Sequence, residues 1–341
     1  MKYNVTIGIP VFRAESFIRK SIESALSQTY PSIEFLVIDD HGQDMSIDIV
    51  REIMMNNNRG KDIRILTHSD NRGVSVSRNH IIDEAQGDYI YFMDSDDTIK
   101  DNTIDLLYHN IRLYDAEIAF GSYEKIDLEG NKTFYRYPSI QLLGKDKMAA
   151  FAYRKYAGIQ ASACNYLVKT SILRENNIRF INANYWEDMV FTFDLVTYIS
   201  KAVLLSEITY SYWCRENSLS HYQQREYISK EEVLGNVISV DYLKKTSFLL
   251  LNKVYFPDRC YNIILTDFYI VCNILKRKKN IHPPFSNKEI KSIMRHPATW
   301  CQIYHFKNKK MINLLLYVIS KLPPSICVAT LWSLSKLKKF I

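Results

Sequence analysis

The chain lacks the features by which several protein classes are most easily recognised. Its six cysteines form no C-x-x-C pair, so neither a zinc site nor a disulfide framework is indicated, and a reduced cytoplasmic setting is the simplest interpretation. No uninterrupted apolar run reaches the roughly 18 residues of a membrane-spanning helix. The first residues run directly into a strand-like segment, so we expect no secretory leader. No internal repeat or low-complexity segment is present.

Acidic residues are absent after Glu289. Nine lysines and arginines follow that position, so the net charge of +7 for the whole chain leaves about −2 for residues 1–289. Within this basic tail, Met311–Ile319 and Ile326–Leu334 are apolar segments too short to cross a bilayer. With their flanking lysines they fit amphipathic helices on an anionic membrane surface. A helical pair docked on the protein is the alternative, and nucleic-acid binding is disfavoured because no recognised motif accompanies the charge.

Strand and helix signals alternate over the first 120 residues. With 341 residues, the chain can form one large domain or two smaller ones. We expect strands at 5–11, 34–38, 63–67 and 89–93, and helices at 15–28, 45–55, 74–85 and about 104–111. This alternation indicates a parallel sheet with helices on both faces, in which ligands bind at the carboxyl ends of the strands.

The remaining segments are mixed and then mainly helical. We expect strands at 117–126, 165–168 and 202–213, helices at 145–156 and 189–199, and long helices near 231–251 and 258–276. A basic run at 276–279 and the His-Pro-Pro of 282–284 mark a boundary or a hinge.

Three carboxylates stand at the carboxyl end of the expected strand 89–93. They belong to Asp94, Asp96 and Asp97, with Ser95 among them. Close like charges repel unless something neutralises them. A divalent cation that holds a diphosphate is one partner, because hard cations take oxygen ligands and share them with phosphates. The alternative is a helix cap, in which Asp96 or Asp97 accepts backbone N–H bonds.

Three further polar signals follow strand ends. Residues 9–12 (IPVF) leave the first strand, where the proline alone would simply end it. Asp39 and Asp40 leave the second strand, where a carboxylate can accept the imide N–H of uracil, which cytosine lacks, or can close a turn. Asn71-Arg72-Gly73 precedes the helix that contains Arg78. Helix N-terminal N–H groups and arginine favour phosphate, while an ordinary helix start is the alternative.

The order of these pieces resembles family 2 glycosyltransferases with a GT-A fold. IPVF, VIDD, NRGVSVSRN and GDYIYFMDSDD follow the family's order, and the last contains its D-x-D metal-binding motif. Trp186-Glu187-Asp188 is similar to the family's E-D motif. Residues 210–220 resemble its Y-x-Y-R-x-R-x-x-S-x-S segment, with Arg215 at the later arginine and Trp213 in place of the first. One departure is DDHGQD at 39–44, where the family has D-D-G-S-x-D, so the glycine has shifted by one.

The resemblance implies a mixed α/β sheet of GT-A type, flanked by helices, with a mainly helical C-terminal region. It implies inverting transfer of a sugar from a nucleotide-diphosphate donor, for which Asp39 indicates UDP. Asp188 is the implied catalytic base with Glu187 beside it, although Asp188 could instead cap the helix that follows. Asp96, with Asp94, is the implied ligand of Mn²⁺ or Mg²⁺, and Asp97 is left as a helix cap. The implied donor-binding residues are Pro10, Val11, Phe12, Glu15, Asp39, Asp40, Asn71, Gly73, Arg78, Asp94, Ser95, Arg215 and Ser218.

We therefore expect a catalytic domain over 1–222, a helical extension over 223–280 and basic amphipathic helices over 281–341. The expected activity is a metal-dependent hexosyltransferase that acts on a glycan or lipid-linked acceptor in surface polysaccharide biosynthesis. Its expected place is the cytoplasmic face of a bacterial membrane, as a peripheral protein. The alternatives are a catalytically silent sugar-nucleotide binding module, which would not need Asp188, and a nucleotidyltransferase, which would release pyrophosphate.

Overall fold

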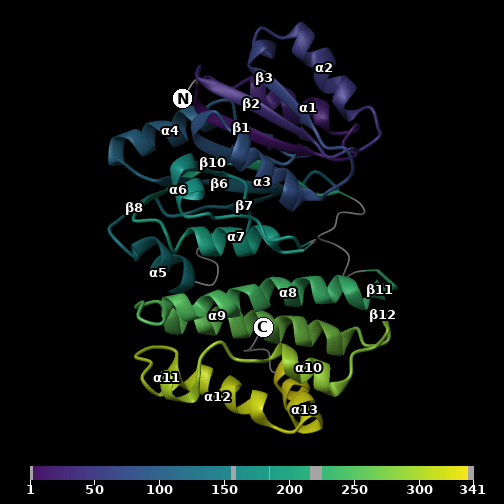
Figure 1. The fold of residues 1–341 in the computed structure, drawn as a ribbon, viewed down its shortest axis with the longest axis vertical. Helices are drawn as coiled ribbons and strands as arrows, with labels where there is room; N and C mark the ends of the chain where they lie inside the picture. Colours follow the sequence, from purple (N-terminus) through teal and green to yellow (C-terminus); the bar gives the residue numbers. More distant parts are fainter. Residues whose placement is uncertain (1–2, 155–158, 184, 216–224, 337–341) are drawn as a thin grey trace. The chain divides into compact units, whose positions relative to one another are not determined.

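A computed structural model describes residues 3–154, 159–183, 185–215 and 225–336 (Figure 1). The chain divides into two compact units. The first contains residues 1–148, 159–182 and 187–216, and the second contains residues 149–158, 183–186 and 217–341. The expected boundary at residue 222 falls outside the described residues, and the three-part division stays a prediction.

The first unit is built on a mixed sheet flanked by helices. Its strands are β1 (Tyr3–Val11), β2 (Ile33–Asp39), β3 (Ile63–Thr67), β4 (Gly87–Phe92), β5 (Thr98–Ile99), β6 (Ile118–Ile126), β7 (Lys132–Tyr135), β8 (Ile140–Leu143), β9 (Tyr166–Lys169) and β10 (Lys201–Trp213). The strand order is β3-β2-β1-β4-β9-β6-β10-β5, with β7 paired to β6 and β8 paired to β10. β3, β2, β1 and β4 are parallel, whereas β9 runs antiparallel between β4 and β6. The expected sheet class is confirmed, and β7 and β8 are strands that were not expected from the sequence.

The helices of this unit follow the expected alternation. They are α1 (Ile18–Leu26), α2 (Ser46–Asn56), α3 (Val74–Glu84), α4 (Thr103–Tyr114), α6 (Thr170–Glu175) and α7 (Glu187–Leu195), with the short 3₁₀ helix η1 (Gly60–Asp62) and with α5 (Lys147–Arg154) crossing into the second unit. α3 packs on β1 and β2, α6 on β4 and β9, and α4 on β6 and β10.

Pro10 lies inside β1 without breaking a ladder hydrogen bond. Gly8 accepts a bond from Met93 N at 3.0 Å, so every second residue of β1 directs its backbone groups toward β4. The pairing with β4 ends at Gly8, before Pro10 is reached. The missing N–H of the proline therefore falls where no partner strand requires it.

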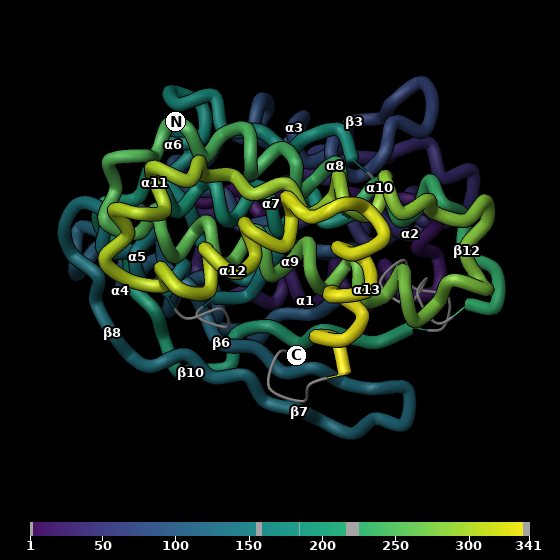
Figure 2. The backbone as a smooth tube through the Cα atoms, turned by 90° about the horizontal axis from the view of Figure 1, so that it is seen from below, coloured from purple at the N-terminus to yellow at the C-terminus, as the bar shows by residue number. Residues whose placement is uncertain are grey.

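The second unit is mainly helical, as expected. It contains β11 (Ile228–Ser229), α8 (Lys230–Thr246), the 3₁₀ helix η3 (Ser247–Leu250), α9 (Phe256–Lys276), β12 (Ile281–His282), α10 (Asn287–Ile293), α11 (Trp300–Tyr304), α12 (Lys310–Lys321) and α13 (Pro324–Ser335). Figure 2 shows α11 to α13 lying across α9, and both α12 and α13 pack against it. Leu316 and Ile319 of α12, with Cys327 and Leu331 of α13, are buried in this packing.

The two apolar segments of the tail are thus helices docked on their own unit. Docking was one of the alternatives open at the level of sequence, and contact with a membrane stays a prediction. Over the described part of the chain, no helix combines the length and the apolar character needed to span a membrane.

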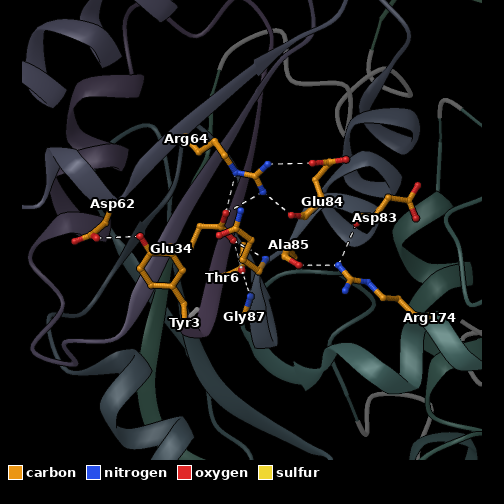
Figure 3. Close-up of polar contacts among 11 residues, drawn as sticks. Tyr3, Thr6, Glu34, Asp62, Arg64, Asp83, Glu84, Ala85, Gly87 and Arg174 are labelled. Carbon is orange, nitrogen blue, oxygen red and sulfur yellow. Dashed lines mark hydrogen bonds and ion pairs between the residues drawn. The ribbon is translucent and has the colours of Figure 1, made fainter. Parts of the chain in front are cut away.

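A buried carboxylate joins the amino ends of the central strands. The Glu34 side chain, on β2, is only 2% exposed. It accepts hydrogen bonds from Thr6 Oγ1 at 2.6 Å and Gln86 N at 2.8 Å, and it pairs with Arg64 at 2.9 Å. Arg64 also bonds to Glu84 at the end of α3 (Figure 3). These hydrogen bonds and the ion pair compensate the Glu34 carboxylate for the free-energy cost of removing its charge from water.

Arg174 of α6 fastens the same end of α3 from the other side. It donates to the carbonyl oxygen of Ile82 at 2.8 Å. It also donates to the carbonyl oxygen of Ala85 at 2.7 Å (Figure 3). The first carbonyl belongs to the last turn of α3 and the second to its C-cap residue, where no intrahelical donor remains for them. The sheet edge opposite the carboxyl ends of β1, β2 and β4 is therefore held by two arginines and one buried glutamate.

We predict that Glu34→Gln lowers the free energy of unfolding by about 3 kcal/mol, because it leaves Arg64 without its buried partner. The control is Glu52→Gln, which breaks an ion pair to Arg19 whose glutamate is 56% exposed. This change should cost less than about 1 kcal/mol. Urea unfolding followed by circular dichroism measures both, and equal losses in the two variants would contradict the structural role of Glu34.

Candidate functional site

The carboxyl ends of β1, β2 and β4 meet at one edge of the sheet. Asp39 ends β2 and pairs in register with Val11 of β1 and Thr67 of β3. Its carboxylate is partly exposed and accepts one backbone bond, from His41 N at 3.0 Å. Asp39 therefore retains acceptor capacity toward a ligand at this edge. Phe12, the residue directly after β1, is exposed.

Asp40 differs from Asp39 because both oxygens of its carboxylate are bonded within the protein. It is buried and accepts hydrogen bonds from Arg72 N at 2.9 Å and Gly73 N at 2.8 Å. His68, directly after β3, lies with its Nδ1 2.7 Å from Asp40 Oδ1. Asp40 thus ties the 71–73 turn to the end of β2. Its expected contact with a donor stays a prediction.

A second histidine continues this chain of contacts. His68 Nε2 and His80 Nδ1, on α3, lie 3.0 Å apart, and the two rings stack with their centroids at 5.2 Å. Burial and the neighbouring His68 lower the pKa of His80. Neither histidine was predicted from the sequence. The available signal was that His68 follows β3 as Asp40 follows β2.

Two glycines shape the loops at this edge. Gly73 precedes α3 with φ +86° and nothing within 4 Å of the position that a Cβ would take, so conformation rather than crowding favours glycine there. Asn71 Oδ1 accepts the Gly73 N–H at 3.1 Å. In the loop after β2, a Cβ on Gly42 would lie 2.8 Å from Arg13 N. Glu15 bonds to this loop through Met45 N at 3.2 Å, which fixes the start of α2.

Arg78 connects the carboxylates that follow β4 (Asp94, Asp96 and Asp97, called the acidic cluster below) to the start of α7. Its side chain is buried, with Nη2 2.9 Å from Asp94 Oδ1 and Nη1 2.9 Å from Glu187 Oε1. Phe180 lies beneath the guanidinium, 5.3 Å from ring centroid to Cζ. Burial opposes the charge, but Asp94 and Glu187 hold the pKa of Arg78 well above its ordinary value. Each terminal nitrogen thus donates to a carboxylate, whereas Nε has no hydrogen-bond partner among the residues that the structure describes.

Asp188 follows Glu187 in the first turn of α7. It accepts a bond from the adjacent Met189 N at 2.7 Å. Burial, with repulsion from Glu187, raises the pKa of Asp188 to about 7, although Arg78 opposes the shift. A carboxyl group with this pKa can take or give a proton near neutrality, as a general base requires.

Asp94, Asp96 and Asp97 form a compact carboxylate cluster. Each offers an oxygen, and these oxygens all lie within 4.8 Å of one another. Burial and the charge of Asp94 raise the pKa of Asp96 to about 6. An all-oxygen, mutually repelling donor set suits a hard divalent cation such as Mg²⁺ or Mn²⁺. The residues therefore fit the expected ion, with Asp94 and Asp96 the more exposed members.

Asp97 does not cap a helix, contrary to expectation. Its carboxylate accepts Tyr210 OH at 2.6 Å and Trp213 N at 2.9 Å, both from β10. The chain after Asp97 pairs with β10 as strand β5, and α4 begins only at Thr103. Asp97 therefore fastens the end of β10 to the acidic cluster. Neither Tyr210 nor Trp213 had been assigned this role.

The end of β10 brings Arg215 to the same cluster. Arg215 forms an ion pair with Asp96, and its guanidinium lies 4.8 Å from the centroid of the Phe17 ring. Trp213 lies beneath Lys20, whose Nζ is 3.3 Å from the ring centroid. Ser95 is partly exposed between the aspartates. Ser218, the last expected donor-binding residue, lies outside the described residues.

Comparisons with known proteins find similar sequences and a similar fold. A family model described as glycosyl transferase family 2 matches residues 6–174, which ends before Glu187, Asp188 and Arg215. An uncharacterized glycosyltransferase of Haemophilus influenzae is 30% identical over 202 residues, which cover 59% of this chain and 75% of that protein. The Escherichia coli UDP-Glc:alpha-D-GlcNAc-diphosphoundecaprenol beta-1,3-glucosyltransferase WfaP is 27% identical over 241 residues, covering 68% and 86% of the two chains.

A solved structure shares the fold. The crystal structure of S. aureus TarS 1–349 in complex with UDP-GlcNAc matches with a TM-score of 0.54 and 16% sequence identity, covering 93% of this chain and 90% of that one.

We predict that Arg78→Lys lowers the free energy of unfolding by about 3 kcal/mol. A lysine ammonium keeps the charge but cannot bridge two carboxylates as the guanidinium does, so Asp94 or Glu187 loses its partner. The control is Arg72→Lys, on the exposed turn before α3, which should change stability by less than about 0.5 kcal/mol. Chemical denaturation measures both, and a stable Arg78→Lys variant would refute the bridging role.

Proposed function

Because the chain belongs to glycosyltransferase family 2, we propose that it is an inverting glycosyltransferase with a UDP-sugar donor. The observation that carries this proposal is the Arg78 bridge, which joins Asp94 of the acidic cluster to Glu187 beside Asp188. A cation-binding edge and a carboxyl group with a pKa of about 7 thus belong to one connected network. Diphosphate departure and deprotonation of the acceptor need these two groups together.

Asp39 supports uracil as the donor base. Its partly exposed carboxylate at the end of β2 can accept the imide N–H of uracil. The 71–73 turn, held by Asp40 and His68, offers the backbone at the start of α3 to the donor. The TarS structure that shares the fold is a complex with UDP-GlcNAc, which agrees with the class of donor proposed for this chain.

Asp96 and Asp94 would hold Mn²⁺ or Mg²⁺, which would neutralise the charge that develops on the departing diphosphate. Asp188, in its deprotonated form, takes the proton of the acceptor hydroxyl. Arg78 holds Asp94 and Glu187 in place through its two ion pairs. One displacement inverts the anomeric centre, so no second carboxylate is needed as a nucleophile.

The proposed acceptor is a glycan or lipid-linked hydroxyl in surface polysaccharide biosynthesis. The name of WfaP includes a diphosphoundecaprenol acceptor, which is lipid-linked. The basic helices of the second unit agree with work at an anionic membrane surface, where such an acceptor resides. We accordingly propose peripheral attachment at the cytoplasmic face of a membrane.

We predict that Asp188→Asn lowers kcat by about 10²–10⁴-fold and leaves the Kd of UDP unchanged, because only the proton acceptor is lost. In the unmutated protein, kcat should rise as the pH rises through about 7, since burial raises the pKa of Asp188 and only its ionised form accepts a proton. The rate of UDP release as a function of pH measures both effects.

Asp194→Asn, on the same helix, serves as the control and should keep the unmutated rate. Transfer by Asp188→Asn at the unmutated rate would overturn the base assignment. UDP binding without any transfer by the unmutated protein would favour the silent binding module. Release of pyrophosphate would identify a nucleotidyltransferase.

We predict that Mn²⁺ strengthens UDP binding and that Asp96→Asn weakens this Mn²⁺-dependent binding by at least about 10-fold. Asp88→Asn, exposed on β4, is the control and should bind as the unmutated protein does. Isothermal titration with UDP and with CDP tests the base as well, because cytosine lacks the imide N–H. Equal affinity for UDP and CDP would refute the role of Asp39.

A further inference from the structure

The second unit carries a group of large apolar side chains that its fold leaves exposed. They come from η3 and the loop after it, from α11, and from the first turn of α12. The five are Phe248 at 66% exposure, Leu249 at 64%, Val254 at 65%, Tyr304 at 63% and Met311 at 76%. We refer to these five residues as the apolar face.

The residues of the apolar face lie next to one buried cluster along the chain, from which we infer that they form one surface. That cluster consists of Phe256, Cys260, Ala298, Ile303 and Phe306, with Leu250, Leu314 and Tyr317 packed against it. Each residue of the apolar face stands within three positions of one of these residues along the chain. Figures 1 and 2 agree, since the turn that joins α8 to α9 and contains η3 lies beside α11 in both views.

The charge around the apolar face has a single sign. Lys307, Lys309 and Lys310 lie between its α11 and α12 residues, and Lys310 Nζ is 4.2 Å from the centroid of the Tyr304 ring. No aspartate or glutamate occurs in residues 247–257 or 290–341. The nearest carboxylate along the chain, Asp258, is buried and bonded to Asn308 Nδ2 at 2.7 Å.

Exposed apolar side chains surrounded by lysines favour one kind of partner over another. A second copy of the chain would bring lysines against lysines, which disfavours self-association through this face. An anionic bilayer satisfies both properties, because apolar side chains enter the acyl region while lysines reach the phosphates. A tyrosine ring with an ammonium beside it suits the boundary between these two regions.

We propose that the apolar face docks on an anionic phospholipid bilayer, with Phe248, Leu249 and Met311 inserted among the acyl chains and Lys307 and Lys310 on lipid phosphates. This surface includes η3, which lies outside the C-terminal tail where membrane contact was expected. It deepens the proposed function by naming the contact that brings the enzyme to a lipid-linked acceptor. It rests on the proposed function only for that acceptor.

The test is co-sedimentation of the full chain with vesicles of equal parts phosphatidylcholine and phosphatidylglycerol, and with vesicles of phosphatidylcholine alone. We expect binding to the anionic vesicles, weakened at least about 10-fold by Phe248→Ser with Leu249→Ser. Lys307→Gln with Lys310→Gln should weaken binding by about fivefold for each lysine. All four positions are on the surface, and circular dichroism checks that the variants fold.

Matched controls test whether any exposed apolar side chain or any pair of lysines would have the same effect on vesicle binding. Met55→Ser removes a more exposed apolar side chain from α2 of the first unit. Lys278→Gln with Lys279→Gln removes two exposed cations from the turn that follows α9. Neither control should change vesicle binding by more than about twofold.

Unchanged binding of the Phe248→Ser, Leu249→Ser variant would overturn the proposal, as would equal binding of the unmutated chain to both kinds of vesicle. A dimer in sedimentation velocity that this variant abolishes would show that a second copy covers the face, and would overturn it as well. UDP binding in solution is measured in parallel. Its absence in the unmutated chain would reject the proposed function and leave the vesicle result standing.

Discussion

The buried guanidinium of Arg78 is the interaction on which the rest of the site depends. It takes one carboxylate from the end of β4 and one from the start of α7, residues that are 93 positions apart in the chain. Without a cation between them, Asp94 and Glu187 would each be a partly buried charge close to another. The bridge sets the position of α7 and, through it, that of Asp188. The bridge uses two of the five N–H donors of Arg78, and the expected contact of Arg78 with the donor stays a prediction.

Local pattern was sufficient to predict the first half of the sheet, because β1, β2 and β4 are mostly buried runs with polar residues at their carboxyl ends, and β3 is a short segment rich in β-branched residues. It was insufficient where strands are short and exposed, as in β7, whose four residues are all exposed. It was also insufficient where the function of a residue depends on distant partners. Asp97 looked like a helix cap because the donors to such a cap are local, whereas its actual donors lie 113 and 116 residues away on β10.

The sequence indicated which positions meet at this edge of the sheet, but it did not predict the contacts that they make within the protein, and their roles toward a ligand stay predictions. Asp39 and Asp40 are adjacent and chemically identical, yet one is partly exposed and the other is buried among three donors. Their difference arises from the alternation of side chains along an extended chain, which points successive residues to opposite faces of the sheet. The same limitation applies to residues 248–251, whose apolar run looked like the continuation of a long helix. α8 ends at Thr246, and the following 3₁₀ helix turns part of that run outward.

Glu34 has a consequence for the opposite edge of the sheet. β2 is a nearly continuous apolar run between two parallel neighbours, and such a strand has little in its own side chains to prevent it from slipping along them. The bonds from Glu34 to Thr6 and Arg64 fix the alignment of β2 with β1 and β3 at a single residue. A slip of two residues would preserve which side chains are buried, but it would carry Asp39 beyond Val11 and Thr67. The stagger of the strands, and therefore which residue of β2 emerges at the ligand edge, is set by a carboxylate at the far end of the same strand.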